Sequence, residues 1–255
     1  MPEKSEILSP LPALTFAEGA RSMMELASLA FSYPLMTGVP RGDGHPVLVL
    51  PGFATNDRMT AVLRSFLTRL GHHVHPWDLG WNLDQHTTGE NGEHIAQRIA
   101  EIRKQTGRKV SLVGWSLGGV IAREATRRDP EDVRQVVTLG SPFTGDPGAT
   151  NLNMLYELLT GNRIADMRKH ARYATGHHVL PVPSSAVYSR TDGITAWQNC
   201  ISETDEKTEN IEVVSSHFGF IANPAVFYIV ADRLSQTEGE WKPFERKGPF
   251  AACYR

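Results

Sequence analysis

The chain has 255 residues, a length that fits one large α/β domain or two small ones. Its 40% hydrophobic and 21% charged residues are typical of a globular protein with an ample core. The formal net charge of −2, without a long basic run, argues against a nucleic-acid partner. Cys200 and Cys253 are too few for a disulfide scaffold. They could form one bond, but we expect free thiols in a reducing compartment.

The N-terminal segment, residues 1–45, is expected to be helical and to pack on the core. Its first residues lack the continuous apolar stretch and the small-residue cleavage site of a secretory signal. Residues 16–31 are too short and too charged for a membrane span, so they predict an amphipathic helix that ends before Pro34. We therefore expect a cytoplasmic protein, with export left open.

From residue 46 onward, strand patterns and helix patterns alternate along the chain. The expected strands are residues 47–50, 72–77, 109–115, 133–143, 185–193 and 210–217. The expected helices are residues 59–70, 95–106, 116–128 and 224–235. Such alternation predicts βαβ units, a mostly parallel sheet and helices on both of its faces. The core is assigned to residues 46–142 and 182–240.

Residues 143–181 interrupt this alternation with two helix-like pieces and no convincing strand. An insertion after a central strand lies over the crevice where open α/β sheets bind ligands, so we interpret it as a small helical cap or lid. Two ordinary surface helices are the alternative. Leu152, Leu155 and Leu159 are expected to pack inward, while Met154, Tyr156 and Leu158 project elsewhere. The basic cluster at residues 163–172 could hold anionic headgroups or be a solvated face.

The stretch VGWSLGG at residues 113–119 places Ser116 in the G-x-S-x-G pattern of a nucleophile elbow. A serine hydroxyl needs a base within hydrogen-bond reach, and a histidine base needs a carboxylate that fixes its tautomer. Asp192 in YSRTDG comes just after the strand-like run at residues 186–188, and His217 in VVSSHFGF comes just after the run at residues 211–214. Asp205 belongs to a charged, solvated run, which makes it a poorer candidate.

The same chemistry needs two backbone N–H groups for the oxyanion of a tetrahedral intermediate. One is expected from Leu117, directly after the serine. The other is expected from Phe53, or less favourably Ala54, because Gly52 lets the preceding chain turn tightly. Trp115 is expected to pack beside the site.

Five motifs in order, VLVLPGF, VGWSLGG, LGSPFTG, YSRTDG and SSHFGFIANP, resemble an α/β-hydrolase of the bacterial lipase and esterase kind. The resemblance implies Ser116 as nucleophile, Asp192 as acid and His217 as base, since the family order is serine, acid, histidine. It also implies Phe53 and Leu117 as oxyanion donors. Many family members have His-Gly where this chain has Pro51-Gly52.

The prediction is a carboxylic ester hydrolase that acts on small-molecule or lipid esters through an acyl-enzyme. Acyl transfer or thioester cleavage by the same triad is the alternative, and a silent ligand-binding homologue is a third. Trp115, Met154 and Leu158 are candidates for an acyl pocket or lid, and the cap is a candidate for transient lipid-surface contact. No metal motif is present and no cofactor is expected. The oligomeric state stays open.

Overall fold

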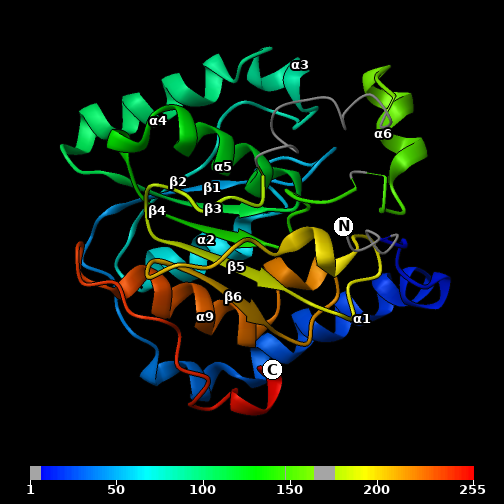
Figure 1. The fold of residues 1–255 in the computed structure, drawn as a ribbon. Helices are drawn as coiled ribbons and strands as arrows, with labels where there is room; N and C mark the ends of the chain where they lie inside the picture. The colour runs from blue at the N-terminus through cyan, green and yellow to red at the C-terminus, as the bar shows by residue number, and fades with distance from the viewer. Residues whose placement is uncertain (1–6, 147, 164–175) are drawn as a thin grey trace.

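The computed structural model describes residues 7–146, 148–163 and 176–255 (Figure 1). Its centre is a six-stranded parallel sheet with the order β2-β1-β3-β4-β5-β6. The strands are β1 (Pro46–Leu50), β2 (His73–His75), β3 (Val110–Trp115), β4 (Val133–Leu139), β5 (Ser184–Tyr188) and β6 (Thr208–Glu212). The predicted parallel α/β architecture is confirmed.

Helices cover both faces of this sheet (Figure 1). One layer holds α3 (Gln85–Thr88), α4 (Glu93–Thr106) and α5 (Leu117–Arg128), and the other holds α1 (Pro12–Phe31), α2 (Ala61–Arg69) and α9 (Pro224–Ser235). Short 3₁₀ helices lie at η1 (Tyr33–Gly38), η2 (Pro130–Asp132), η3 (Trp197–Cys200), η4 (Phe218–Ile221) and η5 (Ala251–Cys253).

Two apolar clusters, one on each face, hold the layers together. The isoleucine stripe of α4 packs on one face as its spacing predicts, because Ile95, Ile99 and Ile102 are all buried. The apolar residues of α9 pack on the other face against α2. Each fully buried aliphatic side chain contributes about 1.5–3 kcal/mol. The central strands β3 and β4 are buried at every position, as strands covered on both faces must be.

The strands β4, β5 and β6 end before their sequence patterns do. β4 ends at Leu139, β5 at Tyr188 and β6 at Glu212, although apolar or β-branched residues continue the pattern beyond two of these ends. Gly140 follows β4 with φ of 55°, which turns the chain out of the sheet. The segments after all three strands are therefore loops at one edge of the sheet.

The helix α6 (Asn153–Thr160) belongs to the insertion after β4. Our expectation for its inward face was wrong, because Leu155 and Leu159 are 41% and 44% exposed while Tyr156 is buried. The tyrosine is the anchor because its hydroxyl donates to a buried carboxylate, that of Asp84, at 2.7 Å. The second predicted helical piece and most of the basic cluster fall on residues 164–175, outside the described residues.

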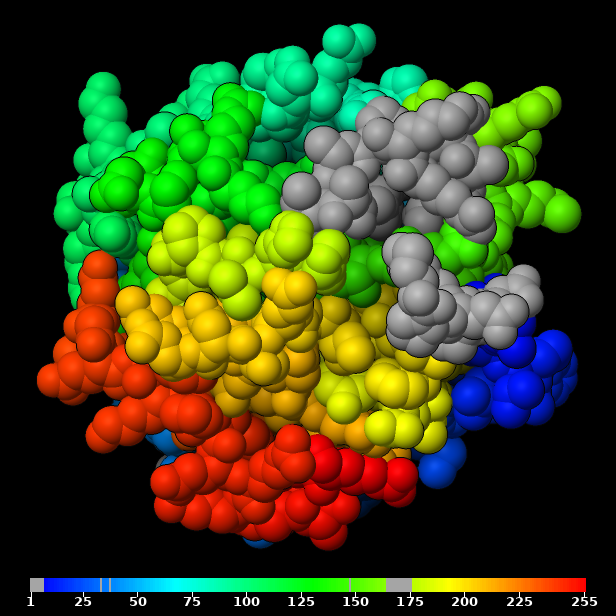
Figure 2. Space-filling view, viewed as in Figure 1, coloured from blue at the N-terminus to red at the C-terminus, as the bar shows by residue number. Residues whose placement is uncertain are grey.

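The helix α6 and the first part of α1 lie on the same side of the molecule (Figure 2). Asn151, just before α6, donates from its side-chain amide to Thr15 Oγ1 of α1 at 2.6 Å. In the part of the chain that the structure describes, no helix combines the length and the apolar run needed to cross a membrane.

Candidate active site

Ser116 occupies a strained turn between β3 and α5. Its φ of 53° and ψ of −125° lie in a region that non-glycine residues rarely adopt, at a cost of about 1–3 kcal/mol. The backbone N–H of Ser116 donates to Leu139 O at 2.9 Å and helps to hold the turn. A Cβ on Gly114 would lie 2.3 Å from Gly119 Cα, and one on Gly118 would lie 2.4 Å from the carbonyl oxygen of Leu50. The glycines around the serine are therefore required by close packing of strand and helix.

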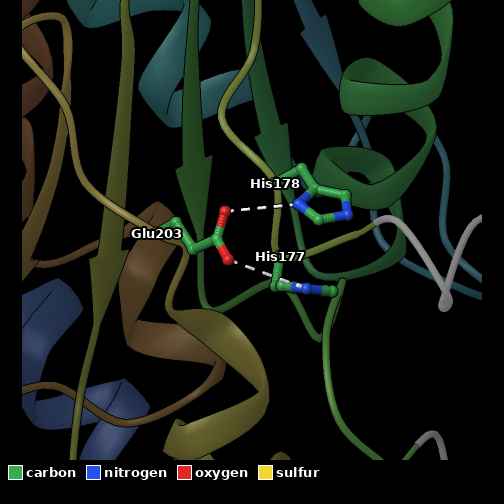
Figure 3. Close-up of side chains that lie close together, drawn as sticks. All are labelled: His177, His178 and Glu203. Atoms are coloured by element: carbon green, nitrogen blue, oxygen red, sulfur yellow. Dashed lines mark hydrogen bonds and ion pairs between the residues drawn. The ribbon is translucent and has the colours of Figure 1, made fainter.

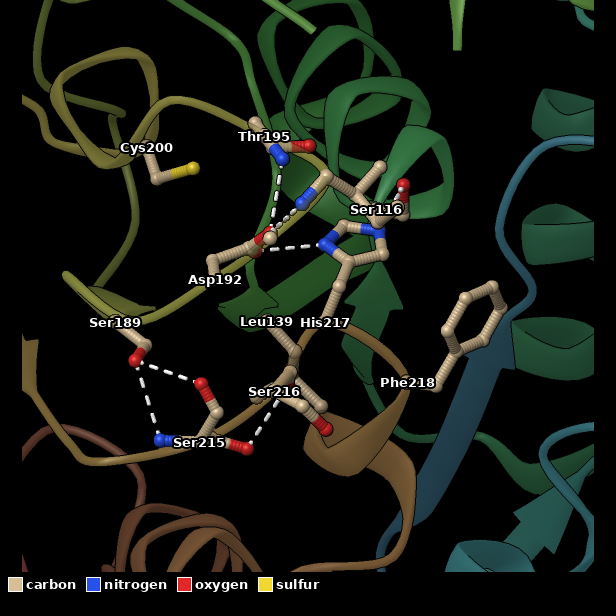
Figure 4. A network of polar contacts seen from close by, with 12 residues as sticks. Ser116, Leu139, Ser189, Asp192, Thr195, Cys200, Ser215, Ser216, His217 and Phe218 are labelled. Carbon is tan, nitrogen blue, oxygen red and sulfur yellow. Dashed lines mark hydrogen bonds and ion pairs between the residues drawn. The ribbon is translucent and has the colours of Figure 1, made fainter. Parts of the chain in front are cut away.

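Ser116, His217 and Asp192 form a hydrogen-bonded line across the loops after β3, β6 and β5 (Figure 4). Ser116 Oγ lies 3.0 Å from His217 Nε2, and His217 Nδ1 lies 2.7 Å from Asp192 Oδ2. All three side chains are buried. Asp205, the poorer candidate for the acid, is exposed in a separate turn before β6. The structure thus brings together the three residues that the motifs single out.

Asp192 is oriented by its own loop. Its Oδ1 accepts hydrogen bonds from the backbone N–H groups of Ile194 and Thr195, each at 2.8 Å (Figure 4). These two bonds leave Oδ2 to face the imidazole of His217. The Cys200 thiol is close by, and burial, followed by the negative charge of Asp192, raises its pKa well above the ordinary value. That thiol therefore stays neutral.

The electrostatic surroundings of His217 favour its charged form. Burial lowers the pKa of the imidazole, but the charge and hydrogen bond of Asp192 and the charge of Glu18 outweigh burial, so the pKa is raised. A base with a raised pKa accepts a proton from a hydroxyl more readily. Trp115 lies beneath this histidine, where its indole N–H donates to the His217 carbonyl oxygen at 3.0 Å. Trp115 is 2% exposed, so its indole supports His217 from within the core.

Two backbone N–H groups are available beside the serine. Among the described residues no hydrogen bond engages the N–H of Phe53 or of Leu117. The alternative donor, the Ala54 N–H, is already used, because it donates to Asn82 O at 2.8 Å. The Asn82 side chain donates in turn to Pro51 O at 2.7 Å and so braces the loop after β1. This geometry favours Phe53 over Ala54 as the second donor.

The helix α6 contacts this same loop. The ring of Tyr156 packs on Phe53 with ring centroids 5.0 Å apart, and its hydroxyl reaches Asp84. Met154 and Leu158 project from the outer side of α6, 85% and 78% exposed. Their part in an acyl pocket or lid stays a prediction.

The hydrogen bonds that α1 makes to the loops of this site were not predicted from the sequence. Glu18 and Glu25 of this helix accept hydrogen bonds from the loops that carry Asp192 and His217. In the sequence they only marked the helix as too charged for a membrane span. Their seven-residue separation places them on one face of a helix, which was the available clue.

One group of possible metal ligands is present among the described residues: His177, His178 and Glu203 (Figure 3). The two carboxylate oxygens of Glu203 divide between the rings, with Oε2 3.2 Å from His178 Nδ1 and Oε1 3.8 Å from His177 Nε2. The shorter of these two contacts is a hydrogen bond between His178 and Glu203. The three side chains are about half exposed.

Comparison with known proteins identifies related sequences. A sequence model of the family described as palmitoyl protein thioesterase matches residues 46–190, more than half of the chain. The matched region contains Ser116 and ends just before Asp192. The pimeloyl-[acyl-carrier protein] methyl ester esterases of Aliivibrio fischeri (strain MJ11) and Shewanella woodyi are 30% identical over 112 residues and 32% identical over 101 residues. These matches cover 42% and 39% of this chain and 41% and 37% of the relatives, so the chain spans about two fifths of their length.

Solved structures share the fold. Aspergillus fumigatus lipase B superposes with a TM-score of 0.59 at 19% identity, over 79% of this chain and 55% of the lipase. An α/β superfamily hydrolase from Oenococcus oeni PSU-1 gives a TM-score of 0.55 at 14% identity, over 76% of this chain and 94% of that one. The predicted α/β-hydrolase fold is confirmed.

Proposed function

Because this chain belongs to the palmitoyl protein thioesterase family, we propose that it is a serine hydrolase that cleaves carboxylic esters through an acyl-enzyme. One observation carries the proposal, which is the hydrogen-bonded line through the imidazole of His217. Its Nε2 lies 3.0 Å from Ser116 Oγ, and its Nδ1 lies 2.7 Å from Asp192 Oδ2. In this proposal Ser116 is the nucleophile, His217 the general base and Asp192 the acid that holds its tautomer.

Acylation follows from these positions. Ser116 Oγ attacks the ester carbonyl carbon while its proton passes to His217 Nε2, and Asp192 stabilises the imidazolium that results. The carbonyl oxygen becomes an oxyanion and accepts hydrogen bonds from the N–H groups of Phe53 and Leu117. Leu117 also begins α5, whose positive end favours negative charge at this point. The carbon–oxygen bond of the ester then breaks, and the leaving alcohol takes the proton from His217.

Deacylation uses the same groups with water as the nucleophile. His217 accepts a proton from a water molecule, and the hydroxide attacks the acyl carbon bound to Ser116. The second oxyanion uses the same two backbone donors. When it collapses, the acid is released and the proton on His217 returns to Ser116 Oγ.

A fluorophosphonate probe tests the nucleophile without knowledge of the substrate. We expect stoichiometric labelling at Ser116, located by peptide mass spectrometry, and none in Ser116→Ala. Hydrolysis of p-nitrophenyl esters of increasing chain length should depend on Ser116 in the same way. A folded wild-type protein that neither labels nor hydrolyses any of these esters would instead support the silent ligand-binding alternative.

Thioester cleavage is the second candidate, favoured by the description of the matching family. The same acyl-enzyme can form from an oxygen ester or from a thioester, so the triad does not distinguish them. The substrates p-nitrophenyl palmitate and palmitoyl-coenzyme A carry the same acyl chain and differ only in the leaving group, so their comparison tests the preference for an oxygen ester or a thioester. A kcat/KM at least tenfold higher for the thioester, after correction for intrinsic reactivity, would identify the physiological class as thioesters. Acyl transfer would appear as product formed with an added alcohol in preference to water.

We assign residues 143–181 to a small cap over a core of residues 46–142 and 182–240, with residues 1–45 packed on that core. The contacts of α1 with η4 and α9 support the last assignment. The contact of Tyr156 with Phe53 supports a cap that reaches the proposed oxyanion loop. Deletion of residues 151–163 should leave short esters as substrates while raising KM for long ones.

Contact with a lipid surface is supported by the exposed apolar side chains of α6 and α1. Met154 and Leu158 project from α6, and Phe16 and Phe31 project from α1 with exposed fractions of 94% and 84%. Large exposed apolar patches mark surfaces for partners or membranes. Co-sedimentation with neutral phosphatidylcholine vesicles should fall in Phe16→Ser and in Met154→Asp. Equal sedimentation of the wild-type protein and the two variants would contradict the proposed contact with a lipid surface.

A reducing compartment is supported by the cysteines, because Cys200 and Cys253 are both free thiols. The proposed location is the cytoplasm. Fractionation of the source cells with a specific antibody tests it directly.

A further inference from the structure

The charged side chains of α1 are turned toward the protein, whereas most of its large apolar side chains are exposed to solvent. Glu18, Arg21 and Glu25 all contact the loops after β5 and β6. The outer side of the helix carries only small or apolar residues at the exposed positions Phe16, Ala20, Met23, Met24, Ala27 and Phe31. We propose that Glu18 is a positioning residue of the triad, which joins the loop of the acid to the loop of the base and places a second negative charge beside His217.

The contacts of Glu18 carry the first part of this proposal. Its carboxylate is 3% exposed and accepts from the Gly193 N–H at 2.8 Å and from the His217 N–H at 2.9 Å. Gly193 directly follows the acid Asp192, so one side chain holds the backbone beside both partners of the serine. No Cβ fits at Gly193, because it would lie 2.5 Å from the backbone of Leu14 in α1. The helix therefore sits directly against the acid loop.

The charge of Glu18 carries the second part. Burial lowers the pKa of the His217 imidazole, and the negative charges of Asp192 and Glu18 more than reverse that effect. Arg21 and Glu25 also bring charges to these loops. The guanidinium of Arg21 lies 3.7 Å from Glu18 and donates to the Thr191 side chain, and the carboxylate of Glu25 bonds Ser216. The thiol of Cys200 is neutral because burial raises its pKa. Removal of the charge on Glu18 should therefore lower the pKa of the base.

Glu25 provides the matched control because it lies two turns further along the same helix. Its carboxylate accepts from the Ser216 N–H at 2.9 Å and from the Ser216 hydroxyl. It bonds neither the N–H of His217 nor that of Gly193. Glu25→Gln removes the same charge from the same face of α1 and leaves the bonds of Glu18 in place.

The test compares Glu18→Gln with Glu25→Gln and rests on the proposed serine hydrolase function. An amide has one acceptor oxygen. In Glu18→Gln this oxygen can keep the Oε1 contacts with the Gly193 and His217 N–H groups, at 2.8 and 3.1 Å, but the NH₂ group then faces the His217 and Phe218 N–H groups that Oε2 accepted at 2.9 and 3.4 Å. We expect kcat/KM near neutral pH to fall about 10–100-fold, as for a small displacement of a reacting group. The acid limb of kcat/KM should move to lower pH in Glu18→Gln and stay in place in Glu25→Gln. An unmoved limb in Glu18→Gln would overturn the proposal.

Two further measurements test the role of Glu18 independently of turnover and of the glutamine variant. In a Ser116→Ala background, NMR titration of the His217 imidazole reports its pKa without any turnover, and addition of Glu18→Gln should lower it. If wild-type protein fails to label or hydrolyse, the proposed function fails, and this titration still decides the role of Glu18. Glu18→Asp retains the charge but withdraws it by one methylene. It provides a second test of the position of this carboxylate if Glu18→Gln does not fold. Wild-type kcat/KM in Glu18→Asp would contradict the positioning role.

Discussion

The substitution Asp192→Asn replaces one carboxylate oxygen at the end of the proposed triad with an NH₂ group, and the surrounding bonds determine the orientation of the new amide. Oδ1 of Asp192 accepts two backbone hydrogen bonds, from Ile194 and Thr195. An asparagine keeps these two bonds only if its oxygen takes the Oδ1 position. Its NH₂ group then points at His217 Nδ1, where the carboxylate oxygen stood at 2.7 Å.

This orientation reverses the tautomer of the histidine. Nδ1 must now accept a hydrogen bond, so the remaining ring proton moves to Nε2, which faces Ser116 Oγ at 3.0 Å. A protonated Nε2 cannot take the serine proton. We expect kcat to fall by about 10²–10⁴-fold, which is roughly 3–5 kcal/mol of transition-state stabilisation. KM should change little, because Asp192 bonds only its own loop and the imidazole.

The assay is hydrolysis of a short p-nitrophenyl ester, with far-UV circular dichroism and melting temperature as checks on folding. Asp205→Asn is the matched control, since it removes the same charge from an exposed carboxylate in the turn before β6. It should retain wild-type kcat. Near-normal kcat in Asp192→Asn together with a large loss in Asp205→Asn would show that the acid was assigned to the wrong carboxylate.

Four more substitutions test the remaining parts of the site. Ser116→Ala should reduce ester hydrolysis by about 10⁴-fold or more with an unchanged fold, and near-wild-type turnover of the purified variant would exclude the mechanism. Met154→Asp and Leu158→Asp should raise KM for long-chain esters and spare short ones, whereas unchanged kinetics for both would remove the lid. Tyr156→Phe should lower the free energy of unfolding by about 1–3 kcal/mol, because the buried Asp84 carboxylate loses a donor, and an unchanged denaturation midpoint would contradict this.

The sequence was sufficient to predict that the three residues of the proposed triad lie together, because of a property of parallel sheets. All strands of such a sheet end at the same edge, so residues just beyond different strands lie near one another. Ser116, Asp192 and His217 follow β3, β5 and β6, which are separated in the sheet only by β4. The turn at Ser116 is a local feature with its own glycine requirement, which is why a five-residue motif could reveal it.

The inward face of α6 could not be predicted in the same way. Periodicity groups residues that share a side of a helix, but it does not say which side has a partner. The decisive partner of Tyr156 is Asp84, which is 72 residues earlier in the chain. A hydroxyl that finds a buried carboxylate outweighs the apolar contacts that Leu155 and Leu159 would gain by facing inward, and both leucines remain partly exposed.

The buried face of α1 was even harder to predict from the sequence, because in this helix the charged side chains face the protein and the apolar ones face solvent. Amphipathic patterning assumes that charged residues face water, since burial of a charge without partners is costly. Glu18 and Glu25 avoid that cost through backbone N–H groups that lie 175–199 residues away in the sequence. With the carboxylates committed inward, the opposite side of the helix is left apolar, and Phe16 and Phe31 face solvent. The inward carboxylate of Glu18, which bonds the loops of Asp192 and His217, and the outward apolar face therefore belong to one arrangement of the helix. A surface that binds α1 would contact the helix that carries this proposed positioning residue.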